Sequence, residues 1–338
     1  MKAVGYRENL PVDDPGALED FESPDPTPLE RDLLVRVRAV SVNPLDTMVR
    51  AGRRFPPQFP GMPTVLGWDV VGVVEKIGAA VTLFKPGDRV YYAGSIIRPG
   101  ANSELHAVDE RIVALAPKSL TDAQAAAMPL TTITAYELLF DRLGVEKHSG
   151  AGRKLLIIGG AGGVGSMLTQ LARQLTNFHV IGTASRSETR KWCLDLGAHT
   201  VIDHKKPLSL GLVSEGIDGV DIVASLIQTE MHYKEIIKVL KPQGKLGVID
   251  NPKIDALALK EKSLSLHWEA MTTRSSYETD DMGQQGQLLA EVSNLVDVGE
   301  IKSTLTSSFG KINAKNLLKA HALIEGKKSQ GKIVLEGF

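Results

Sequence analysis

A short apolar strand pattern that runs directly into a cluster of glycines constrains this chain more than any other feature. Residues Lys154-Leu155-Leu156-Ile157-Ile158 lead into Gly159-Gly160-Ala161-Gly162-Gly163-Val164-Gly165 and then into a helical pattern. Gly160, Gly162 and Gly165 have the spacing G-x-G-x-x-G, which permits a tight turn, close approach of a pyrophosphate and close packing of helix and strand. The N–H groups at the start of the helix would bind that anion. The alternative is a glycine-rich turn that binds nothing.

The residues after the glycine cluster complete a β-α-β unit and bear on the choice of cofactor. A second strand is predicted at His179–Ala184, after a helix of the length that a right-handed crossover needs. An NAD site usually has Asp or Glu at the end of this strand, whereas Ser185 and Arg186 follow here. Together with Arg190 or Lys191 they would hold a 2′-phosphate, which predicts NADPH rather than NADH. The alternative is that these charges are solvated at a helix start.

Composition and charge restrict the classes of protein to which the chain can belong. Its 338 residues suffice for two domains, and 43% hydrophobic with 23% charged residues is typical of a globular protein. The net charge of −1 gives no reason to expect nucleic acid or a membrane surface as partner, so a small molecule is expected. The single cysteine, Cys193, excludes an internal disulfide and a cysteine-rich zinc lobe. With no signal segment at Met1 and no membrane-length apolar run, a cytoplasmic location is expected.

The order of the predicted elements indicates two domains of different architecture. In the first third, short strands alternate with Pro- and Gly-rich turns, as in a small β-barrel-like domain; they are expected at 33–42, 70–77, 89–92 and 103–108. From about Leu120, helices alternate with strands, which predicts an α/β domain with a doubly wound parallel sheet. Its helices are expected at 121–127, 133–140 and 233–240, and its later strands at 200–202, 221–224, 245–249 and 263–268.

The last part of the chain is predicted to return to the first domain. A polar stretch, Arg274–Gln287, precedes expected helices at Gln287–Val298 and Ala314–Glu325 and a closing strand, Lys332–Leu335. This return would place a cleft between the two domains. At the start of the closing strand, Lys332 is interpreted as a solvated charge rather than as a group that approaches the cleft.

Three further segments, taken with the glycine cluster, make the chain resemble a known family over nearly its whole length. They are Val42-Asn43-Pro44-Leu45-Asp46, Leu66-Gly67-Trp68-Asp69-Val70-Val71-Gly72 and Pro129-Leu130-Thr131-Thr132-Ile133-Thr134-Ala135-Tyr136. The chain resembles the medium-chain dehydrogenase/reductase superfamily, and within it the zinc-independent quinone oxidoreductase, or zeta-crystallin-like, branch. The resemblance implies a GroES-like catalytic domain of residues 1–124 and 273–338 and a Rossmann domain of residues 125–272. It also implies NADPH-dependent reduction of quinones or α,β-unsaturated carbonyls.

The residues at two positions argue against catalytic zinc. Zinc alcohol dehydrogenases of this superfamily have cysteine where Asn43 stands and histidine where Trp68 stands, and a catalytic zinc needs about three Cys, His or carboxylate ligands. Asp46 and Asp69 alone would form a poor zinc site, so no metal is expected. Without a Lewis acid, reduction of a simple ketone is difficult. A conjugated acceptor instead spreads the charge onto an oxygen that neutral donors can hold.

Three residues are the catalytic candidates. Asn43 would hold the substrate oxygen or the nicotinamide ribose, since its amide donates without carrying charge; the alternative is an Asn that satisfies a turn. Asp46 would organise the floor of the cleft through hydrogen bonds, or be purely structural. Trp68 would form an apolar pocket wall, or belong to the core. Related enzymes often have tyrosines beyond the Asn segment, but this chain has Met48 and Phe55, which leaves water as a proton source.

Cofactor contacts beyond the glycine cluster are implied by the resemblance. Thr134 resembles a nicotinamide-side contact, His204 lies where relatives place an aromatic residue near the adenosine phosphate, and Ser225 ends a predicted strand. Ligands of open α/β sheets bind at such carboxyl ends. The alternatives are a structural hydroxyl for Thr134 and a surface histidine for His204. Cys193 lies in a helical pattern and is expected to be structural. The expected cofactor set is Thr134, Gly160, Gly162, Gly163, Val164, Gly165, Ser185, Arg186, Arg190, His204 and Ser225.

Two other functions remain open at this point. One is a zinc-dependent alcohol dehydrogenase, and the other is a non-catalytic NADPH-binding protein, either crystallin-like or RNA-binding. Asn43 and Trp68 disfavour the first, and the near-neutral charge disfavours RNA. The expected strand Ser263–Trp268 looks like a sheet edge able to pair with its copy about a two-fold axis, so a homodimer is expected.

Overall fold

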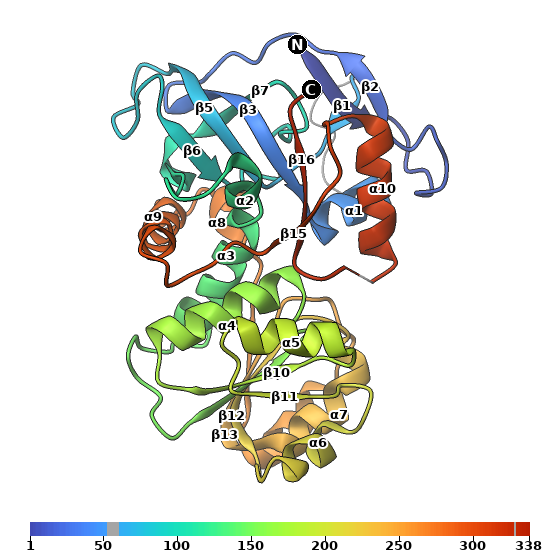
Figure 1. Cartoon of the computed structure of the whole chain (residues 1–338), viewed down its shortest axis with the longest axis vertical. Coiled ribbons are helices and arrows are strands. Elements are labelled where there is room, and N and C mark those ends of the chain that lie inside the picture. The colour runs from blue at the N-terminus through green and yellow to red at the C-terminus, as the bar shows by residue number, and fades with distance from the viewer. Residues whose placement is uncertain (53–60, 328) are drawn as a thin grey trace. The chain divides into compact units, whose positions relative to one another are not determined.

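The computed structural model describes residues 1–52, 61–327 and 329–338 and divides the chain into two compact units (Figure 1). The first unit contains Met1–Ile133 and Thr272–Phe338, and the second contains Thr134–Met271. The boundary between them falls inside helix α3 (Pro129–Tyr136). Phe55, named above in connection with the proton source, lies outside the described residues.

The first unit is built on two sheets. A three-stranded sheet has the order β2-β1-β4, and a larger seven-stranded sheet has the order β15-β16-β3-β5-β6-β8, with β7 also pairing with β3. Its pairs are antiparallel except β15 with β16. The strands are β1 (Lys2–Tyr6), β2 (Glu19–Glu22), β3 (Asp32–Val42), β4 (Thr64–Val65), β5 (Val70–Ile77), β6 (Arg89–Tyr92), β7 (Leu105–Asp109), β8 (Val113–Leu115), β15 (Leu305–Ser308) and β16 (Lys332–Glu336).

Short helices connect these strands and cover the larger sheet (Figure 1). The last strand, β16, pairs antiparallel with β3, so the end of the chain joins the larger sheet of the first unit. This pairing sets Ile333 opposite Val42 and therefore brings Lys332 to the end of β3. The helices of this unit are α1 (Pro44–Arg50), the 3₁₀ turn η1 (Glu110–Ile112), α2 (Asp122–Ala126), α8 (Thr273–Tyr277), α9 (Gln284–Asp297) and α10 (Ala314–Glu325).

The second unit is a doubly wound parallel sheet, as the sequence predicted. Its six strands have the order β11-β10-β9-β12-β13-β14, and each neighbouring pair is parallel. The strands are β9 (Lys154–Ile158), β10 (His179–Thr183), β11 (Thr200–Ile202), β12 (Val220–Ser225), β13 (Leu240–Val248) and β14 (Ser265–Trp268). The connecting helices are the π-helical turn η2 (Glu137–Arg142), α4 (Gly163–Leu175), α5 (Ser187–Asp195), α6 (Leu208–Ser214), α7 (Thr229–Val239) and the 3₁₀ helix η3 (Ala256–Lys262).

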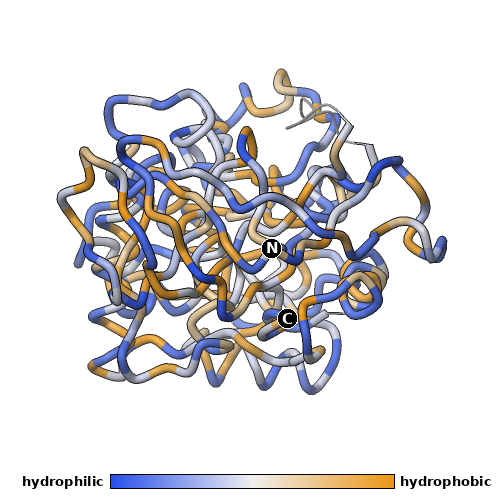
Figure 2. Tube along the Cα trace, turned by 90° about the horizontal axis from the view of Figure 1, so that it is seen from above, coloured by the Kyte–Doolittle hydropathy of each residue, from blue (hydrophilic) through white to orange (hydrophobic). Residues whose placement is uncertain are grey.

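Burial follows the apolar runs from which the strands were predicted. Leu156, Ile181 and Val223, from three neighbouring strands, are all buried in one cluster with Ile236 of α7. A parallel sheet covered on both faces has such nearly continuous apolar strands. Figure 2 shows hydrophobic and hydrophilic stretches alternating along the trace, as expected when turns carry the polar residues. Among the described residues, no helix is both long and apolar enough to cross a membrane.

Three local predictions were wrong. The helix expected at 133–140 begins earlier, as α3 at Pro129, and continues as the π-helical turn η2. The polar stretch 274–287 contains most of α8 and the first turn of α9, because Ser, Arg and Gln side chains are compatible with helices. Strand β13 begins at Leu240 rather than at 245, since Gln243 takes a left-handed φ of 63° inside the strand and the pairing with β12 shifts there.

Candidate functional site

In the first unit, the candidate site begins where β3 ends. Pro44 has no N–H for a sheet and starts helix α1, so Asn43 takes an extended conformation just before the helix. The Asp46 carboxylate reaches back and accepts from the Asn43 N–H at 2.7 Å. Its other oxygen accepts from the Gly67 N–H at 2.9 Å. Gly67 has φ of +110°, and a Cβ there would lie 2.6 Å from Asn102 Oδ1, so the turn requires glycine. Asp46 therefore ties two loops together.

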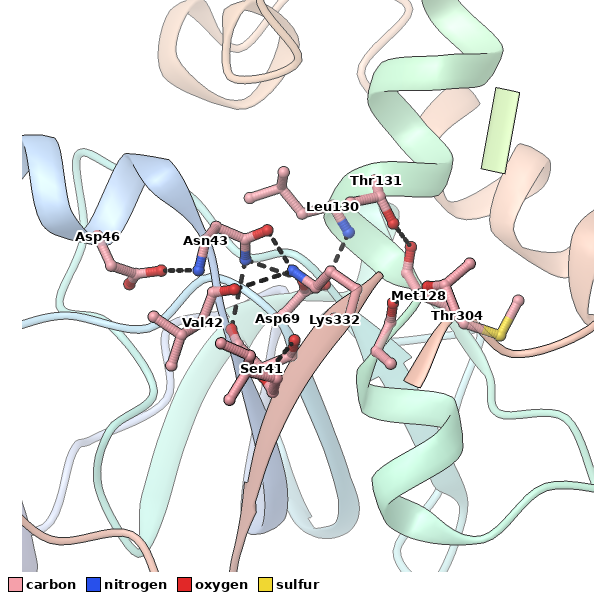
Figure 3. Close-up of polar contacts among 12 residues, drawn as sticks. Ser41, Val42, Asn43, Asp46, Asp69, Met128, Leu130, Thr131, Thr304 and Lys332 are labelled. Carbon is pink, nitrogen blue, oxygen red and sulfur yellow. Dashed lines mark hydrogen bonds and ion pairs between the residues drawn. The ribbon is translucent and has the colours of Figure 1, made fainter. Parts of the chain in front are cut away.

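A buried ammonium lies beside this turn (Figure 3). Lys332, at the start of β16, is only 3% exposed, and its Nζ donates to Asp69 Oδ2 at 2.8 Å and to the Val42 carbonyl at 3.2 Å. It also donates to Asn43 Oδ1. Asp69 Oδ1 accepts from the Leu130 N–H, the second residue of α3, at 2.7 Å. The interpretation of Lys332 as a solvated charge was wrong, because a buried carboxylate from a distant segment compensates its charge.

Both the nitrogen and the oxygen of the Asn43 side-chain amide form hydrogen bonds within the protein. Its Nδ2 donates to Asp69 Oδ2 at 2.9 Å and to the Ser41 carbonyl at 3.3 Å. Its Oδ1 accepts from Lys332, so both N–H groups and one of the two lone pairs of the oxygen have partners within the protein, and the residue is 1% exposed. A side-chain amide has two N–H donors, and its oxygen has two lone pairs that can each accept a hydrogen bond. Oδ1 therefore keeps the capacity to accept one more hydrogen bond, for example from a hydroxyl, whereas a donor to a substrate oxygen would need rearrangement.

Burial changes the protonation of both carboxyl groups. Loss of solvation raises the pKa of Asp46 to about 7, although the N–H groups of Asn43 and Gly67 oppose this shift. Burial also raises the pKa of Asp69, against the attraction of the Lys332 ammonium. The network thus contains one cation and two carboxyl groups, one of which exchanges its proton near neutral pH.

These residues do not fit a catalytic zinc ion. The Asp69 carboxylate already binds an ammonium, whose positive charge would repel a metal ion, and the Asn43 amide is a weak ligand for zinc. Trp68 is buried, and its indole N–H donates to the Ser95 carbonyl at 3.3 Å. Within the described ranges, no group of three or more His, Cys, Asp or Glu side chains is placed to hold a metal.

In the second unit, the glycine cluster forms the turn between β9 and α4. Gly159 supplies the left-handed conformation, with φ of +88°, so the glycine that makes the turn precedes the three that were matched to the motif. Gly162 stands immediately before α4, where a Cβ would meet only the Gly159 carbonyl at 3.4 Å. A Cβ on Gly165 would lie 2.2 Å from the same carbonyl, so this residue lets helix and strand pack closely. Gly163 and Val164 form the first turn of α4.

The strand order places the predicted cofactor residues at one edge of the sheet. The chain runs from β9 to β11 in one direction and resumes at β12 on the other side of β9, so the order reverses between β9 and β12. Open α/β sheets bind ligands at the carboxyl ends of strands at this point. The turn after β9, Ser185 after β10, His204 after β11 and Ser225 at the end of β12 all lie along this edge.

Local contacts distinguish these residues. Ser225 is buried, and its hydroxyl lies 2.7 Å from that of Thr229, which also donates to Asp250 Oδ1 at 2.5 Å. His204 is half-buried, burial lowers its pKa, and its Nδ1 is enclosed without a hydrogen-bond partner among the described residues. Thr134 is buried in α3.

The residues expected to hold a 2′-phosphate lie at the start of α5. Arg186 is exposed and forms an ion pair through Nε with Glu188 Oε1 at 2.8 Å. A guanidinium has five N–H donors, so this pair leaves Arg186 able to bind an anion as well. Arg190 is half-buried on α5, whereas Lys191 forms an i,i+4 pair with Asp195 at 2.7 Å. For Lys191 this pair supports the alternative interpretation, that of a solvated helix charge.

Sequence reasoning missed several participants. Lys332 and Asp250 reach their partners only through the folded sheet, and no local spacing marks them. Gly159 could have been found, since it is the first glycine after the apolar run. Cys193 was placed correctly as a structural residue: it is buried, burial raises the pKa of its thiol to about 11, and its Sγ lies under Gly160.

Comparison with known proteins matches two parts of the chain to dehydrogenase families. Residues 30–118 match a family described as the alcohol dehydrogenase GroES-like domain, and residues 196–335 match one described as zinc-binding dehydrogenase. A zinc-type alcohol dehydrogenase-like protein from Staphylococcus epidermidis is 39% identical and matches over 99% of both chains. The tomato 2-methylene-furan-3-one reductase is 29% identical over 99% of this chain and 79% of its own.

Solved structures agree. A Rhizobium etli protein described as a zinc-dependent alcohol dehydrogenase is 50% identical, with a TM-score of 0.95 over 100% of this chain and 98% of that one. Escherichia coli quinone oxidoreductase, solved with NADPH, is 25% identical, with a TM-score of 0.83 over 99% of this chain and 100% of that one. The chain belongs to the medium-chain dehydrogenase/reductase superfamily of oxidoreductases.

Proposed function

We propose that this protein is an NADPH-dependent reductase of quinones or α,β-unsaturated carbonyls that works without catalytic zinc. The observation that carries the proposal is the buried contact between Lys332 and Asp69 at 2.8 Å, beside Asn43. In this chain an amide and an indole, those of Asn43 and Trp68, stand at the positions where zinc alcohol dehydrogenases of the superfamily have cysteine and histidine. Similarity to a quinone oxidoreductase and to a furanone reductase supports the same substrate class.

The second unit has the features that a dinucleotide needs. The first N–H groups of α4, which follow Gly162 and have no carbonyl one turn earlier in the helix, would receive a pyrophosphate. Ser185 and Arg186 would hold the 2′-phosphate, and the enclosed Nδ1 of His204 would bond near the adenosine. When bound, NADPH supplies a hydride from its nicotinamide ring.

The residues of the first unit determine which acceptors can take that hydride. Asn43 would bind a hydroxyl of the nicotinamide ribose through Oδ1, since its amide hydrogens are already bonded. Asp46 keeps the loop that contains Asn43 in place. The residues described around Asn43 do not fit a zinc ion that could act as a Lewis acid. The substrate must therefore spread the negative charge that develops during hydride transfer through its own conjugated system. Isolated ketones should therefore react poorly.

Turnover assays with a panel of acceptors test the proposal. Oxidation of NADPH should be fast with benzoquinone, phenanthrenequinone and small enones and at least about 100-fold slower with cyclohexanone, measured as kcat/KM. Metal analysis should find no stoichiometric zinc, and EDTA should leave the activity unchanged. Zinc that EDTA removes together with activity would favour the zinc-dependent alcohol dehydrogenase. NADPH binding without turnover of any acceptor would favour a non-catalytic binding protein.

Cofactor choice is tested at Arg186. Arg186→Asp should raise KM for NADPH about tenfold or more and leave KM for NADH nearly unchanged, because only NADPH has the 2′-phosphate. Lys191→Met is the matched control, since Lys191 is already paired with Asp195. A wild-type preference for NADH would contradict the assignment.

Two further expectations stay proposals. We expect a cytoplasmic location, which accords with the free, buried thiol of Cys193, since the cytoplasm keeps thiols reduced. A homodimer would use β14, which lies at the edge of the six-stranded sheet and has half-buried and exposed side chains.

A further inference from the structure

We infer that Lys332 is a positioning residue that fixes the orientation of the Asn43 side-chain amide by holding its Oδ1, and that it acts on the reaction through Asn43. The inference rests on the proposed function, because it assumes that Asn43 lies against the cofactor or the substrate. Lys332 is 3% exposed and forms an ion pair with Asp69, which belongs to a distant segment of the first unit.

The three N–H groups of the ammonium have three acceptors. They are the Val42 carbonyl, Asn43 Oδ1 and Asp69 Oδ2. All three lie at the end of β3 or immediately before β5, in the segments that contain the catalytic candidates. The pairing of β16 with β3 already joins Ile333 to Val42, so β16 does not need Lys332 to hold it in place.

The contacts define which way the Asn43 amide faces. An ammonium only donates, so it selects the amide oxygen, while the Asp69 carboxylate and the Ser41 carbonyl only accept, so they select the amide nitrogen. Turning the amide by 180° would set Nδ2 against Nζ and Oδ1 against two acceptors. As long as Lys332 is charged and Asp69 is ionised, only one orientation is compatible with the network (Figure 3).

Removal of Lys332 would have two separable effects. It would leave the buried Asp69 carboxylate without its cation, which lowers stability. It would also allow Asp69 to take up a proton and donate to Asn43 Oδ1, so that the amide is no longer held in one orientation. Replacing Asp69 by Asn at the same time removes the uncompensated charge and keeps an acceptor for the Leu130 N–H. This double variant separates stability from positioning.

The experiment compares four proteins with the wild type: Lys332→Met, Lys332→Met/Asp69→Asn, Asn43→Ala, and the triple variant with all three changes. Urea unfolding, kcat and KM with benzoquinone, and the Kd for NADPH from fluorescence are measured for each. Lys332→Met should unfold at lower urea, and the double variant should recover most of that loss. Lys315→Met, on the exposed face of α10, is the matched control and should match the wild type.

Positioning predicts that recovery of stability does not bring recovery of function. The double variant should lose at least about tenfold in kcat/KM or in NADPH affinity, with the same division between the two as Asn43→Ala. In the triple variant the changes at Lys332 and Asp69 should cost less than about twofold beyond Asn43→Ala, since a residue that acts through Asn43 has no effect in its absence.

Three results would overturn the inference. The first is a double variant that regains wild-type kcat/KM and Kd, which would make Lys332 purely structural. The second is equal losses with and without Asn43, which would mean that Lys332 acts independently. The third is an Asn43→Ala protein with unchanged kinetics and unchanged Kd, which would leave nothing to position. If the wild type reduces no acceptor, the proposed function fails, and the same comparison is made on NADPH affinity alone.

Discussion

The second unit contains a buried pair of carboxyl groups that predicts a specific dependence of stability on pH. Glu137 begins the π-helical turn η2, Arg142 ends it, and Glu269 follows β14. Both glutamate side chains are fully buried, whereas Arg142 is 31% exposed. The Nε of Arg142 lies 2.8 Å from Glu269 Oε2, and its Nη2 lies 3.6 Å from Glu137 Oε2. One cation thus faces two acidic groups. Burial, and then the charge of Glu137, raise the pKa of Glu269 to about 9.

The sign of the effect follows from the protons bound in each state. An unfolded glutamate has its ordinary pKa of 4.5, whereas the folded pair keeps one proton up to about pH 9. Between these values the folded state binds one proton more than the unfolded state, so stability falls as pH rises. The loss is about 1.4 kcal/mol per pH unit, or roughly 3 kcal/mol from pH 7 to pH 9, after which it levels off.

Glu269→Gln removes this titration with little change of shape. Its free energy of unfolding, compared with that of the wild type at the same pH, should rise by about 1.4 kcal/mol for each unit between pH 7 and 9. Glu137→Gln should reduce the wild-type slope as well, because the charge of Glu137 contributes to the raised pKa of Glu269. The nearby His267 does not contribute in this range, since burial lowers its pKa below the ordinary 6.5.

The assay is equilibrium urea unfolding at half-unit steps of pH, with Glu261→Gln as the control at an exposed position of η3. The control should follow the wild-type slope. A difference between Glu269→Gln and wild type that stays constant from pH 7 to 9 would show that the folded protein holds no extra proton there. It would refute the reasoning from burial.

Three other outcomes are expected. Gly165→Ala should weaken NADPH binding about tenfold or more, because a Cβ would meet the Gly159 carbonyl at 2.2 Å, while Gly283→Ala, with open space around it, should bind normally. Arg50→Met should lower the free energy of unfolding by about 3 kcal/mol in urea titration, since Arg50 is buried and bonds Glu325. Sedimentation should show a dimer, and Trp268→Lys in β14 should shift it toward monomer; a wild-type monomer would contradict the edge-strand proposal.

Most of the second unit was predictable because its signals are local. The apolar run 154–158 and the glycines after it place β9, the turn and α4 within a few residues, and the strand at 200–202 was predicted without error. The π-helical turn η2 was not predictable. Its buried acid, Glu137, and its last residue, Arg142, both interact with Glu269, more than 100 residues later.

In the candidate site of the first unit, too, the local contacts were predictable from the sequence and the long-range contacts were not. Asn43 and Asp46 were found because both belong to one short turn before and after Pro44, and the contact from Asp46 to the Asn43 N–H is local. The Gly67 contact joins segments 21 residues apart, and only the fold gives it. Sequence spacing could show which loops contain polar residues, but not that both amide hydrogens of Asn43 would be bonded within the protein.

Lys332 shows why a charged residue at a strand end cannot be interpreted from its neighbours alone. It is 263 residues from Asp69 and 289 from Asn43, and in sequence it simply precedes the apolar run Ile333-Val334-Leu335. Such a lysine is usually solvated, because burial of an unpaired ammonium is costly. The same cost applies to Asp69, which is fully buried at the start of α3 and needs a compensating cation. In this chain the lysine that supplies this positive charge comes from the closing strand, β16. The buried acid is therefore the signal from which the buried base could be inferred.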